Sequence, residues 1–512
     1  MIAVSSPSEI ADPAATPEPA PKRITAWTLA RPPSIAAQMP VLAAIVLTAY
    51  LATAALRIVV GAAEPLWLDE AWTGLHASQP TFAAFLREVY VDINAPLYYV
   101  AMWAWAALFG LSNEALRFPS LAIGLAAPLL ALLAARSLDR PTRLIWCGLL
   151  ASWTPGIWQA QEARCYTLLF ALCAAGTILH IRLLAKPGLG RAAAWAGVGA
   201  LAILTHYYAV LLFGCQGLAF LAACRGRAFR TWPSALLFLP AFGWMAYHLP
   251  QLIGFAEVNW YTTLQLSALP WLFLFAAGPA PVVLGVMAAG IPGTVFGVEV
   301  RRAASPLAWT VGATLAATAI LVATGFVRPS FTPRYLTLMV PGLMLGLAAW
   351  AASVARARPW APGVLLFASL AWAAFWSATI GASAGRVLNY QTASEHLMRE
   401  GVETVAFAWD NPSAWALPAD KTAELGSFFF RRAGNSAEVR GVVLGSGKDP
   451  NAELLATVRG ARRPGLIWIY DKAVPGTLGI AHPPAIEARD PSWSCRDFGR
   501  LTITILACVR RG

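Results

Sequence analysis

The stretch "PVLAAIVLTAYLATAAL", residues 40–56, contains no charged side chain and is long enough to cross a bilayer as a helix. Similar apolar runs continue to about residue 382. Of the 512 residues, 58% are hydrophobic and only 12% are charged, which excludes an ordinary soluble globular protein. At about 20 residues per crossing, these runs predict a polytopic α-helical membrane protein with about 11–13 transmembrane helices.

Composition divides the chain into three parts. Residues 1–39 are rich in Pro, Ala and Ser and predict a disordered cytoplasmic tail. Residues 40–382 form the transmembrane domain, which includes a polar loop at 64–95. After residue 383, the strand-like pieces "VETVAFAW", "GLIWIYD" and "LTITILACV" predict a small C-terminal periplasmic α/β domain, residues 383–512.

The net charge of +12 is spread over short basic clusters between the apolar runs, so cytoplasmic loops explain it better than nucleic-acid binding. Positive connections at 136–143, 182–191, 225–230 and 356–358 would face the cytoplasm, and loop 64–95 the other side. Two crossings between 96 and 135 conflict with this assignment. Either one of these runs is re-entrant or bent, or the interpretation of the charge at 136–143 is wrong.

The loop motif "WLDEAW", residues 67–72, places Asp69 and Glu70 between tryptophans. Two interpretations stay open. The carboxylates are simply solvated, or the tryptophans press them against the membrane interface, where a carboxylate can act as a base.

Further polar residues lie at the ends of apolar runs on the side of this loop. Arginines are usual in cytoplasmic loops, but Arg334 lies on the opposite side of the membrane. Its position there predicts either anchoring to lipid headgroups or a site for a lipid phosphate. The candidate binding residues are Asp92, Asn94, Gln161, Glu162, Arg164, Tyr166, His206, Tyr207, Arg334 and Tyr335.

Cys495 and Cys508 flank a strand-like segment in the C-terminal region, and they would form a disulfide if that region faces an oxidising compartment. The sequence requires no cofactor. A divalent metal stays open as an alternative, with Glu70, Asp92 and His206 as its candidate ligands. The chain has no Walker loop, no GxGxxG motif and no HExxH motif, which argues against nucleotide-driven pumps and soluble sugar-nucleotide enzymes.

Six stretches in order resemble the motifs of bacterial glycosyltransferase family 39, over roughly residues 60–340. These are membrane enzymes of the C superfamily, similar to protein mannosyltransferases, the aminoarabinose transferase of lipid A and rhizobial galacturonosyltransferases. The stretches are "LWLDEAW", "DINAPLYYVAMWAWAALFG", "EALRFPSLAIG", "QAQEARCYTLL", "THYYAVLL" and "PRYLTLMVP".

The resemblance implies an enzyme of the bacterial inner membrane that takes its sugar from a polyprenyl-phosphate donor on the periplasmic side. It puts Asp69 on the catalytic aspartate, Glu70 on its acidic neighbour and Asp92 on the acid of the second motif. We expect Glu70 to contact the acceptor or a metal. It assigns Gln161, Glu162 and Arg164 to a polar cavity, and Arg334 with Tyr335 to the lipid phosphate. The second motif of the family usually reads His-Pro-Pro, whereas this chain has Asn94 and Ala95 before Pro96.

The expected activity is therefore inverting transfer of a sugar to a hydroxyl of a glycolipid, polysaccharide or protein. Inversion follows if a single base assists direct displacement at the sugar. The alternative is a transporter or flippase for a lipid or a lipid-linked sugar, which would move its ligand without forming a bond.

Overall fold

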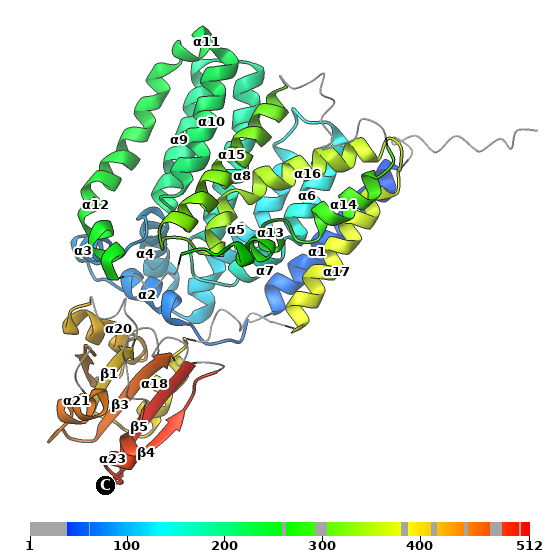
Figure 1. Ribbon diagram of the computed structural model, residues 1–512. Coiled ribbons are helices and arrows are strands. Elements are labelled where there is room, and N and C mark those ends of the chain that lie inside the picture. The colour runs from blue at the N-terminus through cyan, green and yellow to red at the C-terminus, as the bar shows by residue number, and fades with distance from the viewer. Residues whose placement is uncertain are drawn as a thin grey trace, which may run out of the picture.

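A computed structural model describes residues 38–60, 62–258, 263–291, 305–379, 388–410, 417–444, 449–471, 484–500 and 503–511. Nearly all of the predicted tail lies outside these residues. The described chain forms a helical bundle with a small domain that contains a sheet at one end (Figure 1). This architecture confirms the predicted fold class.

Within the described residues, six helical segments are long and apolar enough to cross a membrane. They are Met39–Val59 (α1), Asn113–Leu133 (α5), Tyr166–Ala185 (α8), Trp232–Gly254, Pro306–Val327 (α15) and Ala361–Thr379 (α17). The segment Trp232–Gly254 combines the 3-10 helix Trp232–Phe238 (η1) with most of Leu239–Val258 (α12). A bent pair, with an angle of 86° between its halves, counts as a seventh. One half is the 3-10 helix Leu266–Ala268 (η2) with Leu269–Ala277 (α13), and the other is Ala280–Ala288 (α14).

Shorter apolar helices lie beside these spans: Leu97–Phe109 (α4), Leu189–Thr205 (α9), Ala209–Cys224 (α10) and Val340–Val354 (α16). If all four also crossed the membrane, the seven spans above would become eleven, the lower bound of the expected number. The remaining bundle helices are Leu68–Ala77 (α2), Phe82–Val91 (α3), Arg140–Ser152 (α6), Thr154–Gln159 (α7), Gly226–Phe229 (α11) and the 3-10 helix Pro333–Leu338 (η5).

Helix α4 settles the conflict in topology, because both of its ends lie near the C-terminal domain. Before α4, Glu88 pairs with Lys421 of that domain at 2.5 Å. After α4, Asn113 Oδ1 accepts a hydrogen bond from Arg432 at 2.7 Å. The apolar run at 96–111 therefore returns to the side on which it starts, and α5 is the first crossing after the loop.

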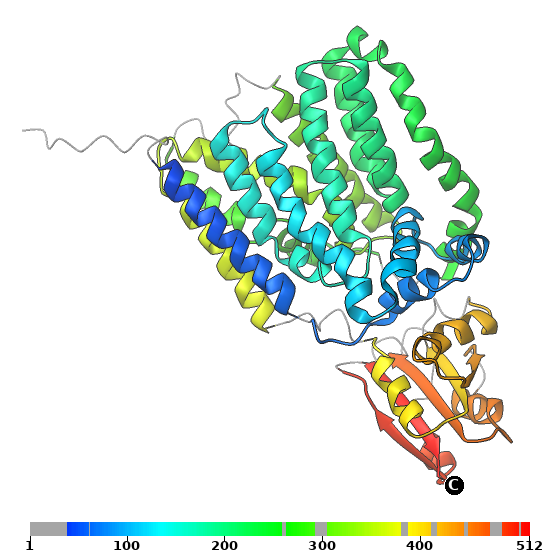
Figure 2. The same ribbon diagram turned by 180° about the vertical axis from the view of Figure 1, so that it is seen from behind.

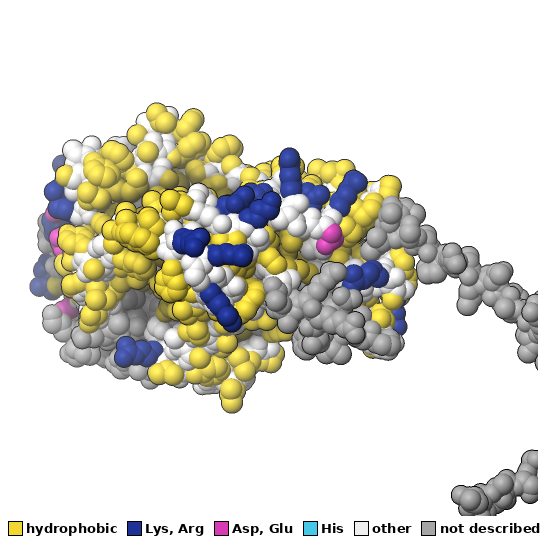
Figure 3. Space-filling model, turned by 90° about the horizontal axis from the view of Figure 1, so that it is seen from above, with side chains coloured by type: hydrophobic (Ala, Val, Ile, Leu, Met, Phe, Trp, Pro, Cys, Tyr) yellow, Lys and Arg dark blue, Asp and Glu magenta, His cyan; other side chains and the backbone are white. Residues whose placement is uncertain are grey.

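Basic side chains gather at the opposite end of the bundle. Figure 3 looks onto that end and shows many Lys and Arg side chains but very little Asp or Glu among the residues it colours by type. The connections there, before α6, before α9 and on either side of α11, carry Arg136, Lys186, Arg225 and Arg230. The two ends of the bundle thus differ strongly in charge.

The C-terminal domain has a five-stranded sheet of order β2-β1-β3-β5-β4. Its strands are Thr404–Asp410 (β1), Glu438–Val442 (β2), Pro464–Asp471 (β3), Trp493–Asp497 (β4) and Ile503–Arg510 (β5). Strand β1 pairs in parallel with β2 and β3, whereas β5 pairs antiparallel with β3 and β4. Its helices are Gln391–Arg399 (α18), Ala419–Arg432 (α20), Pro450–Thr457 (α21) and Ile486–Arg489 (α23).

Cys495 and Cys508 are opposite each other on β4 and β5 and form a disulfide. This bond joins the two strands at one edge of the sheet. A disulfide is typical of domains outside the reducing cytosol.

Helix α2 and the C-terminal domain share one hydrophobic core. Leu68 and Leu75 of α2 pack in the same buried cluster as Phe428 of α20. The Leu68 N–H also donates to the Leu388 carbonyl at 2.8 Å. The views from both sides place α2 between α20 and the bundle (Figures 1 and 2). The domain is therefore a supporting wall for α2.

Gly74 is the point of closest approach between α2 and α20. A Cβ at this position would lie 2.2 Å from Phe428 Cζ, inside a buried contact. We expect Gly74→Ala to lower the free energy of unfolding by about 1–3 kcal/mol, because the added methyl overpacks the interface. Thermal unfolding of the purified protein in detergent measures this effect.

Gly214→Ala on α10 is the matched control, because a Cβ at that position would have nothing within 4 Å. An alanine there should leave the melting temperature unchanged or raise it slightly. Equal melting temperatures for the two variants would contradict tight docking of the domain on α2.

Candidate active site

Asp69 and Glu70 lie in the first turn of α2, after Trp67, which has an extended backbone. Unpaired backbone N–H groups make the start of a helix favourable for negative charge. Consecutive helical residues point about 100° apart, since a turn takes 3.6 residues. The two carboxylates therefore face different surroundings.

Asp69 faces two arginines that come from distant parts of the chain. Its Oδ2 lies 3.2 Å from Arg334 Nη1 and 3.6 Å from Arg164 Nη2. The Asp69 and Arg334 side chains are 29% and 33% exposed, whereas that of Arg164 is only 7% exposed. Solvent therefore reaches this cluster at Arg334 but hardly at Arg164.

Two aromatic rings lie against the Arg334 guanidinium. Its Cζ lies 5.4 Å from the ring centre of Trp67 and 5.8 Å from that of Tyr166. Burial opposes its charge, but Tyr166, Asp69 and Glu162 outweigh burial and raise the pKa of Arg334 above its usual range. Arg334 therefore keeps its positive charge beside Asp69.

Asp92 forms a second, buried acidic centre. Its Oδ2 accepts hydrogen bonds from His76 Nε2 at 2.8 Å and from the Tyr99 hydroxyl at 3.0 Å. Its Oδ1 accepts from the backbone and side-chain nitrogens of Asn94 at 2.9 and 2.6 Å. Burial alone would raise the pKa of Asp92, but His76, Arg164 and Asn94 lower it well below its usual range.

Tyr99 joins this centre to the first one. Arg164 Nη1 donates to the Tyr99 hydroxyl at 3.1 Å and to the Asp69 carbonyl at 3.3 Å. A continuous chain of hydrogen bonds thus runs from Asp92 through Tyr99 and Arg164 to Asp69.

Glu70 lies on the other face of α2 and is fully buried. Arg117 of α5 donates to its two oxygens at 2.8 and 2.6 Å. The backbone N–H groups of Ala163 and Trp67 donate to it at 2.9 and 3.3 Å. The structure therefore places Glu70 in a buried support for the site rather than at the predicted acceptor or metal contact.

Two other predicted residues also lie in supporting contacts. The Gln161 side chain donates to the carbonyls of Leu56 and Arg57 at the end of α1, at 3.0 and 2.7 Å. The Tyr207 hydroxyl contacts His248 Nδ1 of α12 at 2.6 Å. These contacts join helices around the site.

His206 and Tyr335 lie on the side of the cluster beside Tyr166. The ring centres of His206 and Tyr335 are 4.7 Å apart, and those of His206 and Tyr166 are 6.2 Å apart. Burial and, less strongly, Arg164 lower the pKa of His206 to about 3. His206 therefore stays neutral at physiological pH.

The three predicted metal candidates Glu70, Asp92 and His206 make separate contacts. Across the residues that the structure describes, no group of three or more His, Cys, Asp and Glu side chains could hold a metal ion. Among the described residues, Arg164 and Arg334 supply the positive charge beside Asp69.

Sequence reasoning did not select Arg117, His76 or Tyr99 as site residues. Arg117 and Tyr99 lie inside the motifs quoted above, but no local pattern shows which acid each one contacts. His76 is the last residue but one of α2, and its contact with Asp92 depends on how α3 turns back. Only the folded structure shows which side chains contact these acidic residues.

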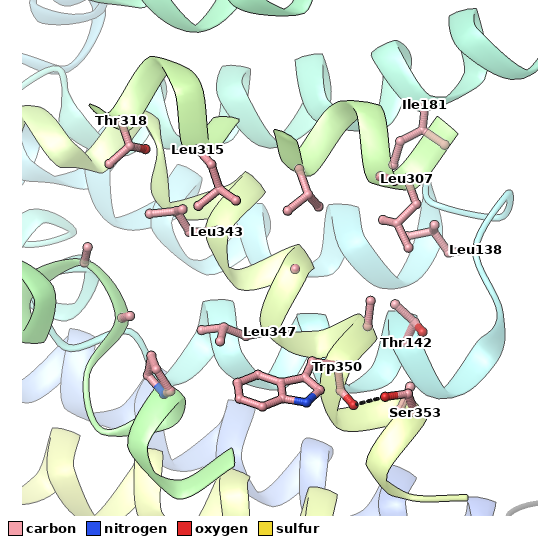
Figure 4. A pocket seen from close by; sticks show the side chains of 18 of the residues that line it. Leu138, Thr142, Ile181, Leu307, Leu315, Thr318, Leu343, Leu347, Trp350 and Ser353 are labelled. Atoms are coloured by element: carbon pink, nitrogen blue, oxygen red, sulfur yellow. Dashed lines mark hydrogen bonds between the residues drawn. The ribbon is translucent and has the colours of Figure 1, made fainter. Parts of the chain in front are cut away.

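An apolar groove reaches η5, the element that carries Arg334. Its volume is about 1490 Å³, and its wall includes Leu336, which follows Arg334 by two residues on η5. In Figure 4, Leu315, Leu343, Leu347 and Trp350 line the groove along α15 and α16. Its far end reaches Asp139 and Arg356 at the basic end of the bundle.

The different surroundings of the two neighbouring acids predict different effects on stability. We expect Glu70→Gln to lower the free energy of unfolding by about 3–5 kcal/mol, because it leaves the Arg117 charge buried and unpaired. Asp69→Asn should cost less than about 1 kcal/mol, because Asp69 and Arg334 are partly exposed and the buried Arg164 keeps its hydrogen bonds to Tyr99 and to the Asp69 carbonyl. Thermal unfolding of the two variants in detergent measures these changes. Equal losses of stability would contradict the assignment of Glu70 to a buried support and of Asp69 to a partly exposed site.

No protein-family model matches the chain, and no curated protein matches it in sequence. Its fold is similar to that of ArnT from Cupriavidus metallidurans bound to undecaprenyl phosphate, with 14% identity and a TM-score of 0.52. The apo structure of the same protein gives 12% identity and a TM-score of 0.53. Each match covers 92% of this chain and 98% of the other. The fold expected from the resemblance to glycosyltransferase family 39 is thus confirmed.

Proposed function

We propose that this protein is a membrane glycosyltransferase that moves a sugar from a polyprenyl-phosphate donor to a hydroxyl acceptor. Two observations together carry the proposal: Asp69 pairs with Arg164 and Arg334, and the apolar groove reaches Leu336, two residues after Arg334. A carboxylate and guanidinium groups close in the chain to one end of a lipid-sized groove suit a substrate with a charged head and an apolar tail. The solved ArnT structure with undecaprenyl phosphate supports this donor class.

The groove suits the tail of such a donor in both composition and length. Its lining along α15 runs from Ser305 to Val322, which is about 25 Å of helix. This approaches the hydrocarbon thickness of a bilayer, about 30 Å. A polyprenyl chain in the groove would have its phosphate near η5, where Arg334 lies.

Asp69 is the base in this proposal. The acceptor hydroxyl attacks the anomeric carbon and gives its proton to Asp69, as the bond from that carbon to the phosphate oxygen breaks. The phosphate leaves with the bonding electron pair, and arginine charge stabilises it. Direct displacement of this kind inverts the anomeric centre.

We assign the site to the periplasmic side of a bacterial inner membrane. The basic end of the bundle lies opposite the C-terminal domain, and positive loops favour the cytoplasm. The disulfide between Cys495 and Cys508 also suits an oxidising compartment on the side of that domain.

Loss of the Asp69 carboxylate should abolish transfer. We expect Asp69→Asn to reduce transfer by about 100-fold or more, because general-base catalysis contributes about that much. Mass spectrometry of envelope glycolipids, polysaccharides and glycoproteins compares a deletion strain that carries the wild-type gene with one that carries the variant. The sugar missing from the deletion strain should stay missing with Asp69→Asn.

Glu64→Gln is the matched control for this measurement. Glu64 is an acid of the same loop, and its carboxylate pairs weakly with Arg500 at 3.5 Å. This variant should restore the sugar. Full restoration by Asp69→Asn at equal expression would remove Asp69 from the role of base.

Filling the groove should weaken binding of long lipid tails. Ala349 of α16 lines the groove, so we expect Ala349→Phe to weaken binding of a long-chain polyprenyl phosphate more than that of a short-chain one. Titrations of the purified protein with both lipids measure the difference. Ala44→Phe on the exposed face of α1 is the control, and equal affinities for all three proteins would contradict a tail in this groove.

A further inference from the structure

The Asp69 oxygen that lies nearest Arg334 also lies near Arg164. Both guanidinium groups converge on Oδ2, at 3.2 and 3.6 Å. To take a proton from a hydroxyl, a carboxylate oxygen needs a free lone pair directed at that hydroxyl. In the structure Oδ2 faces both arginines, so a hydroxyl can reach this oxygen only after an arginine has moved away.

The two arginines are held in different ways. Arg164 is buried, and it donates to the Tyr99 hydroxyl and to the Asp69 backbone carbonyl as well as facing the carboxylate. Arg334 is one-third exposed, and it lies across the faces of Trp67 and Tyr166. A guanidinium stacks on aromatic rings through its face and keeps its N–H groups for hydrogen bonds, so these contacts do not oppose a change of hydrogen-bond partner. Arg334 is therefore the one of the two that can change partner.

We propose that the donor phosphate frees the base by taking Arg334 away from Asp69. This inference rests on the proposed function, since it needs a phosphate at the head of the groove. Guanidinium pairs with phosphate through two parallel hydrogen bonds, whereas its contact with Asp69 is a single one at 3.2 Å. The exchange thus replaces a weaker contact by a stronger one and leaves Asp69 to the acceptor.

With this exchange, charge is conserved through the catalytic cycle. The proton of the hydroxyl moves to Asp69 while the leaving phosphate takes the electron pair of the broken bond and the second negative charge. Arg334 stays on the phosphate until the polyprenyl phosphate departs. It returns to Asp69 once that carboxyl has released its proton to water.

A double-mutant cycle on binding tests the exchange without any need for transfer activity. The full-length protein in detergent is titrated with a polyprenyl phosphate in four forms: wild type, Asp69→Asn, Arg334→Gln and the double variant. We expect Asp69→Asn alone to tighten binding by about threefold to fivefold, because the phosphate no longer competes with the carboxylate for Arg334. The gain should disappear when Asp69→Asn is made in the Arg334→Gln background.

A polyprenol with the same tail is the control ligand, and its affinity should stay the same in all four proteins. An equal gain in both backgrounds would overturn the exchange, because it would show only repulsion between Asp69 and the phosphate. No gain in either background would overturn it as well. If the wild-type protein does not bind the polyprenyl phosphate at all, the proposed donor fails together with the exchange, whereas the other two outcomes leave the donor standing.

Discussion

The buried ion pair between Glu70 and Arg117 is the constraint on which the site depends. Four donors from three segments meet the Glu70 carboxylate: two from Arg117 of α5, one from the turn before α8, and one from the residue before α2. Removing one partner would leave a charge in an apolar core, so all three segments are tied to one point. Asp69, one residue earlier, then has little freedom in where it lies.

The C-terminal domain completes this support from the other side. Helix α2 has only ten residues, too few to be stable alone in water. Its apolar face packs on Phe428 and neighbouring residues of α20, and its start bonds to the Leu388 carbonyl. A domain that could be thought of as an appendage is thus needed to form the helix that carries the proposed base.

Much of the fold follows from the sequence because membrane helices and alternating strands have strong periodic patterns. Strands β1, β3 and β5 fall on the stretches predicted for them, since each has a run of β-branched and aromatic residues. The sequence of helix α4 does not show whether the helix crosses the membrane, because an apolar run that crosses and one that returns to the same side have the same pattern. The contacts at its two ends show that it returns. For the site, the sequence indicates that Asp69, Arg164 and Arg334 share one side of the membrane. Only the family resemblance separates the roles of Asp69 and Glu70 in the sequence, and their different surroundings appear only once Arg117 is seen to contact Glu70.

The charges around Asp69 fit the proposed reaction in one further respect. During displacement, the proton arriving on Asp69 removes a negative charge there, and the leaving phosphate gains one. The total charge of the site stays constant and only its position changes, from α2 toward the head of the groove. A cation that passes from Asp69 to the phosphate before displacement begins is already in place where the negative charge develops. Arg334, held by aromatic faces between carboxylate and groove, has the position that such a cation requires.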